Sequence, residues 1–266
     1  MTISVIIPTF NREKTIERSI LSVLSQTHPI NEIIIVDDCG SDNTKEIIDN
    51  LNNNIIKYVR LNNNQGPAHA RNYGVSLASG DWIAFQDSDD EWHPNKIEKQ
   101  LDYIHSHHGC RFVYSSYYND NQKCDIPLYY NMERYEGTML PTLLYRNTVG
   151  APTILMEKAL FHEVNGFNTS MKALEDWDFA IKIAQKCPLG FISESLITVY
   201  HVDASISASI ANYYQCKCLI IATYLSEYQK YNCFNEVLMG IYAEAMQDGV
   251  ESYIEQLLTL YLTKGV

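Results

Sequence analysis

The first 115 residues alternate short apolar runs with stretches of helical periodicity. The apolar runs lie at 3–8, 32–36, 55–60 and 82–86, and amphipathic segments separate them. Short continuous apolar runs are typical of strands that are buried on both faces, and parallel strands need a long crossover, usually a helix, between them. The rhythm therefore predicts an α/β fold in which a mostly parallel, doubly wound sheet is flanked by helices.

The rest of the chain is more helical. Helical periodicity resumes at 157–164 and 176–187, and it dominates from residue 206 onward. Residues 116–150 show no clear period, and long irregular stretches inside compact domains often shape a pocket. We therefore expect a core domain over 1–205 and a helical C-terminal extension over 206–266, packed on the core or on another subunit.

Charge and composition exclude several classes of function. The formal net charge is −12, which argues against a nucleic-acid-binding surface because such a surface needs a basic stripe. The seven cysteines are scattered without a C-x-x-C pair, as expected for reduced thiols. No signal peptide is apparent, and no apolar stretch reaches the roughly 18 to 20 residues of a membrane span. We expect a cytoplasmic protein, and peripheral contact with the membrane stays open.

Acidic and polar residues follow the apolar runs. The first run ends in Pro8-Thr9, the second in 37–38 and the fourth in 87–90, with carboxylates in the last two. Because ligands bind outside the carboxyl ends of the strands in open α/β sheets, these side chains are expected at one crevice. Carboxylates are costly to desolvate there without a partner, and a divalent metal that carries a phosphate would supply one. The alternative at 87–90 is a solvated acidic loop that caps the next helix. The alternative at 37–38 is that Ser41 and Asp42 cap the following helix, which would make the pair partly redundant.

Two further segments carry candidate chemistry. The acidic cluster Glu175-Asp176-Trp177-Asp178 begins a predicted helix. It either complements the helix dipole or supplies a general base, which needs a carboxylate within reach of a hydroxyl. Arg71 follows a turn and a proline that suit a helix start, and it either binds a phosphate bidentately or pairs with a nearby Asp.

The histidines are weaker candidates for a metal site, and the common glycine-rich phosphate-binding motifs are absent from the sequence. His105, His107 and His108 lie at a predicted helix end and do not recur at ligand spacing on one face, so we do not read them as a metal site. His201 closes the core domain, where metal or phosphate contact and a purely structural role remain open. Neither G-x-G-x-x-G after the first strand nor G-x-x-x-x-G-K-[ST] is present, which disfavours dinucleotide and P-loop folds.

In combination these segments resemble the family 2 glycosyltransferases of the GT-A fold. The resemblance covers roughly 1–205 and depends on seven ordered segments: 4–11, 35–38, 66–72, 78–81, 85–90, 166–167 and 175–178. It implies inverting transfer of a sugar from a nucleotide donor, usually a UDP-sugar, to an acceptor hydroxyl. The nucleotide half would then span about 1–115 and the acceptor half about 116–205.

The resemblance also implies roles for individual residues. The expected nucleotide-binding residues are Pro8, Thr9, Phe10, Glu13, Asp38, Arg71, Asp87 and Ser88. A Mn²⁺ or Mg²⁺ ion would be held by Asp89, with Asp87 and His201 as further ligands. Asp176 would be the catalytic base, and we expect Glu175, Trp177 and Gly150 to contact the sugar or the acceptor. By analogy, the acceptor is a glycan or lipid-linked glycan used in cell-surface glycan biosynthesis.

The chain departs from the family pattern near the end of the core. His201 stands where the family often has Arg, Asp203 where it usually has His, and Lys182 where Arg is frequent, so the third metal ligand is open.

Two rival hypotheses are a sugar-nucleotide pyrophosphorylase, whose glycine-rich first loop is missing at 9–14, and a non-catalytic glycan-binding or scaffold module. Self-association through the C-terminal helices also stays open. Specificity for the donor sugar is assigned to 116–153.

Overall fold

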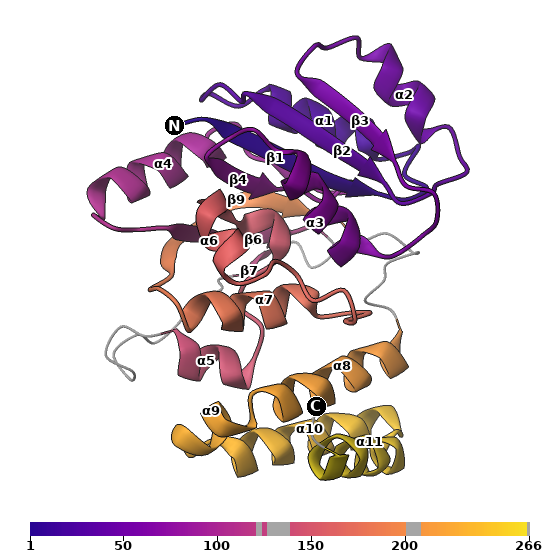
Figure 1. The fold of residues 1–266 in the computed structure, drawn as a ribbon, viewed down its shortest axis with the longest axis vertical. Coiled ribbons are helices and arrows are strands. Elements are labelled where there is room, and N and C mark those ends of the chain that lie inside the picture. Colours follow the sequence, from indigo (N-terminus) through magenta and orange to yellow (C-terminus); the bar gives the residue numbers. More distant parts are fainter. Residues whose placement is uncertain (121–123, 127–138, 201–208, 265–266) are drawn as a thin grey trace.

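A computed structural model describes residues 1–120, 124–126, 139–200 and 209–264. Its strands are β1 (Ile3–Thr9), β2 (Glu32–Asp37), β3 (Ile56–Arg60), β4 (Trp82–Phe85), β5 (Glu91–Trp92), β6 (Phe112–Asn119), β7 (Cys124–Ile126), β8 (Leu155–Glu157) and β9 (Gly190–Val199). All of them join one sheet, in the order β3-β2-β1-β4-β8-β6-β9-β5, with β7 added to β6. This sheet forms the centre of the upper part of the molecule in Figure 1.

The N-terminal half of the sheet is parallel, as predicted. β1 pairs in parallel with β2 and β4, and β2 pairs in parallel with β3. Every residue of β1 and β2 is buried, which explains why these strands read as continuous apolar runs. The crossovers contain α1 (Ile16–Leu24), α2 (Thr44–Asn50) and α3 (Pro67–Leu77), and α3 starts at the proline that suggested it.

The second half of the sheet is mixed. β8 lies antiparallel between β4 and β6, β5 is antiparallel to β9, and β6 is parallel to β9. The second half therefore combines the parallel pair β6 and β9 with antiparallel pairs. β8 has three residues and leads directly into a helix, so it carries too little periodicity to be recognised from the sequence.

Helices cover both faces of the sheet. α1 and α4 (Lys96–Ser106) pack on the face of the sheet that carries Val5 and Ile7 of β1, with α4 over β6 and β9, and α3 packs on the opposite face, which carries Ile6. A Cβ at Gly74 of α3 would lie 2.5 Å from Cγ2 of Ile6, so only glycine allows this close approach. The second face is also covered by α6 (Lys158–Glu163) and α7 (Glu175–Ala184), and α5 (Leu140–Tyr145) packs on α7. The 3-10 turn η2 (Ala151–Thr153) leads into β8.

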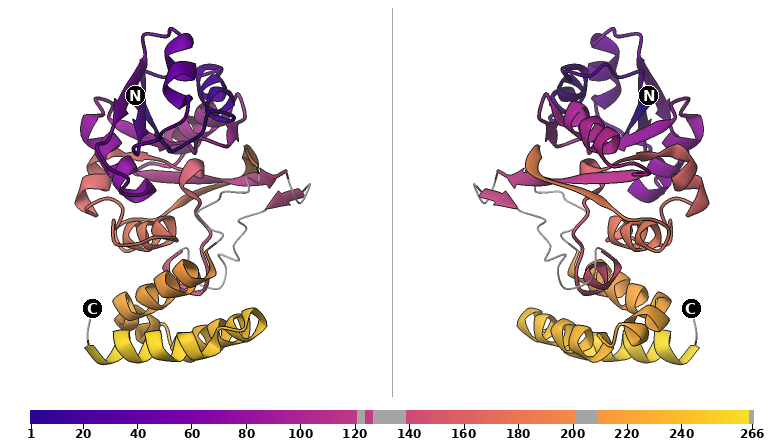
Figure 2. Two further views of the ribbon diagram at one scale, coloured as in Figure 1. Left: turned by 90° about the vertical axis from the view of Figure 1, so that its right-hand side faces the viewer. Right: turned by 90° about the vertical axis from the view of Figure 1, so that its left-hand side faces the viewer.

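The C-terminal extension is helical, as predicted, and it packs on the core. It consists of α8 (Ile210–Thr223), α9 (Leu225–Lys230), α10 (Phe234–Asp248) and α11 (Glu251–Lys264). These helices form a separate layer at the end of the molecule away from the N-terminus, and α5 and α7 lie between them and the sheet (Figures 1 and 2). Buried residues of α8 join the same hydrophobic cluster as α7 and β1. No helix within the described ranges has the length and apolar character needed to cross a membrane.

Candidate functional site

A cleft of about 520 Å³ opens at the carboxyl ends of β1, β2 and β4. The predicted residues that line it are Pro8, Thr9, Phe10, Asp38, Asp87, Ser88 and Asp89. Asn11, Arg12, Asn64, Gly66, Pro67 and Ala70 complete the lining. The strand ends that the sequence singled out therefore meet in one cleft, as expected for the crevice of an open α/β sheet.

Asp38 and Asp37 have different structural roles. Asp38 is buried, and its two carboxylate oxygens accept the backbone N–H groups of Gln65 at 2.8 Å and Gly66 at 2.7 Å. These bonds fix the turn that enters α3 across the cleft from β1. Asp37 instead accepts Gly40 N–H and the hydroxyl of Tyr58, so it serves the local fold. The capping alternative is present at Asp42, whose Oδ1 accepts the backbone N–H of Thr44, the first residue of α2, at 3.1 Å.

Side chains of α1 hold the backbone of the loop 87–90. Ser19 Oγ donates to the carbonyl oxygen of Asp87 at 2.8 Å, and the guanidinium of Arg18 donates to the carbonyl of Asp89. The carboxylates of this loop are left crowded. Burial, and then the charge of Asp87, raise the pKa of Asp89, while Arg12 opposes this with its Nε 3.4 Å from Asp89 Oδ2. The loop thus brings several carboxylates together, and Arg12 only partly offsets their mutual repulsion.

Arg71 links the cleft to the acidic cluster of α7. Its guanidinium is buried, and it donates from Nη2 to Asp87 Oδ1 and from Nη1 to Glu175 Oε1, both at 2.7 Å. Burial alone would lower the pKa of Arg71, but the charges of Asp87 and Glu175 outweigh burial and raise it. The ion-pair alternative from the sequence is therefore present, and it uses carboxylates from two distant segments.

Asp176 lies next to Glu175 in the first turn of α7, which begins after a left-handed residue, Leu174, at φ 59°. Its Oδ1 accepts a hydrogen bond from Asn147 Nδ2 at 2.9 Å. Burial, and then the neighbouring charges of Glu175 and Asp87, raise the pKa of Asp176 to about 7 against the opposing effect of Arg71. Asp176 is not part of the cleft lining, and it is connected to the cleft through Glu175 and Arg71.

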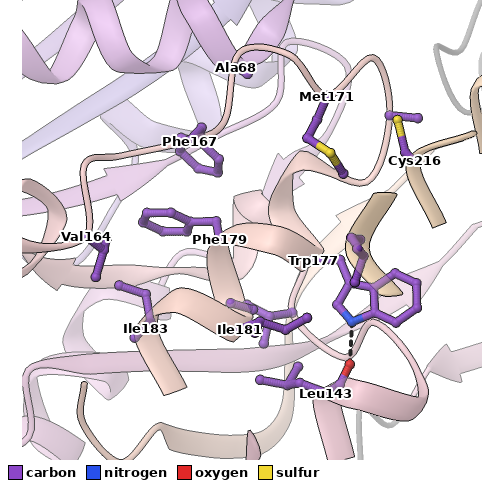
Figure 3. Close-up of a cluster of buried hydrophobic side chains, with 14 of the residues drawn as sticks. Ala68, Leu143, Val164, Phe167, Met171, Trp177, Phe179, Ile181, Ile183 and Cys216 are labelled. Carbon is purple, nitrogen blue, oxygen red and sulfur yellow. Dashed lines mark hydrogen bonds between the residues drawn. The ribbon is translucent and has the colours of Figure 1, made fainter. Parts of the chain in front are cut away.

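Trp177 lies in the hydrophobic core instead of at the site. It is 3% exposed, and its indole N–H donates to the carbonyl oxygen of Leu143 in α5 (Figure 3). One residue along an α-helix turns the side chain by about 100°, so Trp177 lies on another face than Asp176. The expected contact between Trp177 and the acceptor does not agree with this placement.

The remaining predicted residues are more peripheral. Glu13 stands outside the cleft lining, and its Oε2 accepts hydrogen bonds from the backbone N–H and the side-chain Nδ2 of Asn43. Gly150 precedes η2, and its carbonyl accepts the hydroxyl of Thr153 at 2.6 Å. His201 and Asp203 fall outside the described residues. Lys182 donates to the carbonyl of Gly166 at 2.6 Å and thereby ties α7 to the turn after α6.

Within the described residues, no group of at least three His, Cys, Asp or Glu side chains could hold a metal. The donor set nevertheless suits one, because Asp87 and Asp89 provide hard carboxylate oxygens at the cleft, and Mg²⁺ and Mn²⁺ complete their coordination with water and phosphate oxygens. The residues present therefore fit a divalent ion bound jointly with a phosphate ligand.

Some residues of the site were not found from the sequence. Arg12 lines the cleft and pairs with Asp89, and its only signal is its position just after the first strand. Asn147 contacts Asp176, but it lies in an aperiodic stretch 29 positions away in the sequence. Nothing local to these residues indicates their partners.

Known proteins share both the sequence pattern and the fold. The family "Glycosyl transferase family 2" matches residues 4–160. An uncharacterized glycosyltransferase of Haemophilus influenzae is 31% identical over 69% of this chain and 62% of its own length. The glucosyltransferase WfgD of Escherichia coli is 32% identical over 66% of each chain. The chain matches between 28% and 62% of the length of the first four curated relatives.

Solved structures share the fold. S. aureus TarS 1–349 in complex with UDP-GlcNAc has a TM-score of 0.69 and 22% identity, over 98% of this chain and 72% of that one. Mannosyltransferase PcManGT from Pyrobaculum calidifontis, in complex with GDP-Man and Mn²⁺, has a TM-score of 0.67 and 15% identity, over 98% of this chain and 81% of that one. Since the family match covers more than half of the sequence and the strand ends form the expected crevice, this chain belongs to glycosyl transferase family 2.

Proposed function

We propose that the chain is an inverting glycosyltransferase that moves a sugar from a nucleotide donor of the UDP class to an acceptor hydroxyl. The observation that carries this proposal is the Arg71 bridge, which connects Asp87 at the cleft with Glu175, the neighbour of Asp176. A transferase needs a donor site and a base in one constellation, and this ion-pair bridge joins them. Family membership favours a transferase over a pyrophosphorylase.

The cleft suits a nucleotide. Its lining combines apolar residues, which include Pro8 and Pro67, with polar residues such as Asp38 and Asn64. Thr9 belongs to the lining, and its hydroxyl is buried without a hydrogen-bond partner among the described residues. Pockets with apolar walls and a few placed polar groups are typical of small-molecule sites. We assign the nucleoside to the part of the cleft that these residues line.

Asp87 and Asp89 would hold Mn²⁺ or Mg²⁺ together with the donor diphosphate. The ion would neutralise negative charge on the departing nucleoside diphosphate, so that the leaving group needs no general acid. Arg71 holds Asp87 in place, and Arg12 limits the repulsion at Asp89. In this arrangement the carboxylates of the chain orient the diphosphate end of the donor.

Asp176 would take the proton of the acceptor hydroxyl. As the O–H bond breaks, the acceptor oxygen attacks the anomeric carbon, and the bond from that carbon to the diphosphate oxygen breaks with its electron pair on the leaving group. A single displacement of this kind inverts the anomeric centre. A base whose pKa is about 7 is well matched to proton removal near neutral pH.

The acceptor class is inferred from relatives. WfgD is named as a glucosyltransferase that acts on α-D-GlcNAc-diphosphoundecaprenol, and TuaG of Bacillus subtilis as a putative teichuronic acid biosynthesis glycosyltransferase. We therefore propose a glycan or lipid-linked glycan acceptor in the assembly of a cell-surface polysaccharide. A lipid-linked acceptor would bring the protein to the membrane surface.

The proposal is tested with a panel of nucleotide sugars, with and without Mn²⁺. Binding of the true donor should raise the melting temperature and give Mn²⁺-dependent hydrolysis or transfer. Asp89→Asn should lose Mn²⁺-dependent UDP binding, whereas Asp176→Asn should keep UDP binding and lose transfer by about 100-fold or more. Asp49→Asn, at an exposed ion pair on α2, is the matched control and should behave as wild type.

Two further assays, one with a nucleoside triphosphate and a sugar phosphate and one with glycans, separate the rival hypotheses. Release of pyrophosphate from a nucleoside triphosphate and a sugar phosphate would indicate a pyrophosphorylase. A protein that binds glycans but neither hydrolyses nor transfers any donor sugar would be a binding module. Full turnover by Asp176→Asn would contradict the assignment of the base.

A further inference from the structure

Asn147 joins two groups through its side-chain amide. It lies between α5 and η2, where Nδ2 donates to Asp176 Oδ1 at 2.9 Å and Oδ1 accepts the backbone N–H of Val149 at 3.0 Å. An amide has one accepting oxygen and one donating nitrogen, so only one of its two flipped orientations satisfies both partners. The bond to Val149 therefore fixes Asn147 as a hydrogen-bond donor to Asp176.

The segment that carries Asn147 is itself held firmly. The next two residues, Thr148 and Val149, are 2% and 1% exposed. Upstream, the carbonyl of Leu143 accepts the indole N–H of Trp177, which follows Asp176 in α7 (Figure 3). The Asn147 amide and the Trp177 indole are thus two cross-links between the 143–149 stretch and the first turn of α7.

We propose that Asn147 is a positioning residue that orients the Asp176 carboxylate for removal of the acceptor proton. This inference rests on the proposed role of Asp176 as the base. The hydrogen bond fixes the rotation of the carboxylate by holding Oδ1, and it leaves Oδ2 as the oxygen for the acceptor hydroxyl. A catalytic group that is already oriented raises the rate, because less conformational entropy is lost on reaching the transition state.

The charges around Asp176 explain why a neutral donor is suitable. Glu175 in α7 and Asp87 after β4 disfavour the ionised carboxylate, and Arg71 in α3 favours it. A hydrogen bond to the charged form also favours that form. A lysine or arginine in place of Asn147 would pair with the carboxylate and weaken it as a base, whereas an amide orients it without adding a charge.

The test compares Asn147→Ala and Asn147→Asp with wild type in steady-state kinetics over a range of pH. Loss of orientation should lower kcat by about 10- to 100-fold in Asn147→Ala, with an unchanged donor KM and unchanged UDP binding. The acidic limb of the kcat/KM profile should move to higher pH. Asn147→Asp places a second carboxylate next to Asp176. This variant should therefore shift the acidic limb further toward high pH and lose more activity than Asn147→Ala.

Asn53→Ala is the matched control. Asn53 also accepts a backbone N–H two residues on, from Ile55 at 3.1 Å, but it lies in the exposed loop between α2 and β3. It should keep the kcat and pH profile of wild type. UDP binding by the Asn147 variants shows that they have folded.

Two results overturn the inference. One is a wild-type kcat and pH profile in Asn147→Ala, and the other is a fall in kcat that goes with weaker UDP binding and an unmoved pH profile, which indicates structural damage. Failure of the proposed function looks different, because Asp176→Asn would then retain full turnover whatever the Asn147 variants do.

Discussion

At the scale of single residues, the site balances one buried guanidinium against partly buried carboxylates. Arg71 offsets Asp87 and Glu175, and Asp176 stays beside this cluster with one neutral donor. An uncompensated buried carboxylate takes up a proton more readily than one in water, because burial disfavours its charged form. The residue that we assign as the base is therefore also the residue whose protonation state changes near neutral pH.

The pH dependence of activity follows from this placement. Because the pKa of Asp176 is raised to about 7, its carboxyl group becomes protonated and inactive as a base when the pH falls below that value. We expect kcat/KM to fall about tenfold per pH unit on the acidic side. Initial rates at fixed Mn²⁺ between pH 5 and 9 check this. A rate that stays flat down to pH 5 would contradict the assignment.

Replacing Arg71 by Lys tests the bridge. One ammonium group cannot span the two carboxylates as the planar guanidinium does, so Arg71→Lys should lower stability by about 2–3 kcal/mol and activity by at least about tenfold. Arg111→Lys is the control, since Arg111 also bridges two carboxylates, Glu157 and Glu163, but at the surface. It should cost less than about 1 kcal/mol. Urea unfolding and donor turnover measure both effects, and equal losses in the two variants would argue against a special role of Arg71.

At the scale of elements, α7 is the helix on which the site depends. It carries Glu175 and Asp176 at its start, and its other faces are fixed by three neighbours: Leu143 in α5, Gly166 in the turn after α6, and Tyr224 between α8 and α9. The hydroxyl of Tyr224 donates to Asp178 Oδ1 at 2.7 Å in the buried interior. The residue that joins α8 and α9 thus contacts α7 directly.

Removing the hydroxyl of Tyr224 tests how far the stability of the protein depends on this contact between the C-terminal extension and α7. Tyr224→Phe leaves a buried carboxylate oxygen of Asp178 without its donor, at a cost of about 1–3 kcal/mol. Tyr214→Phe is the control, because Tyr214 donates to Asp248, which is exposed and can bind water instead. Thermal unfolding should therefore separate the two variants by several degrees. A Tyr224→Phe protein as stable as Tyr214→Phe would show that the link is unimportant.

At the scale of the whole molecule, the sheet and the C-terminal helices share one core. Buried residues from β1, α7, α8 and α10 belong to a single hydrophobic cluster, which extends across the layers seen in Figure 2. A continuous core of this kind couples the stability of its parts. The extension is therefore part of the folded unit and not an independent appendage.

A core substitution in α8 should lower the stability of the whole folded chain. Ile221 is 1% exposed, so Ile221→Ala should destabilise the protein by about 2–5 kcal/mol in one transition that includes the sheet. Met239→Ala, at a position that is 73% exposed, should stay within about 0.5 kcal/mol of wild type. Calorimetry checks both, and two separate transitions in Ile221→Ala would show that the layers unfold independently.

The sequence by itself determined the features that depend on neighbouring residues. The runs at 3–8 and 32–36 became buried parallel strands, Pro67 began a helix, and the C-terminal periodicity became helices, because burial pattern and turn chemistry act locally. The convergence of Asp38, Asp87 and Asp89 also followed from the sequence, since it depends only on parallel strands ending at one edge.

Tertiary structure decided the rest. The antiparallel insertion of β8, the burial of Trp177 and the bond from Asn147 to Asp176 depend on which distant segments meet. Arg71 pairs with Glu175 across 104 positions of sequence, and no local pattern encodes such a partner. Periodicity describes which face of an element is apolar, whereas side-chain partners are fixed only when those faces pack against one another.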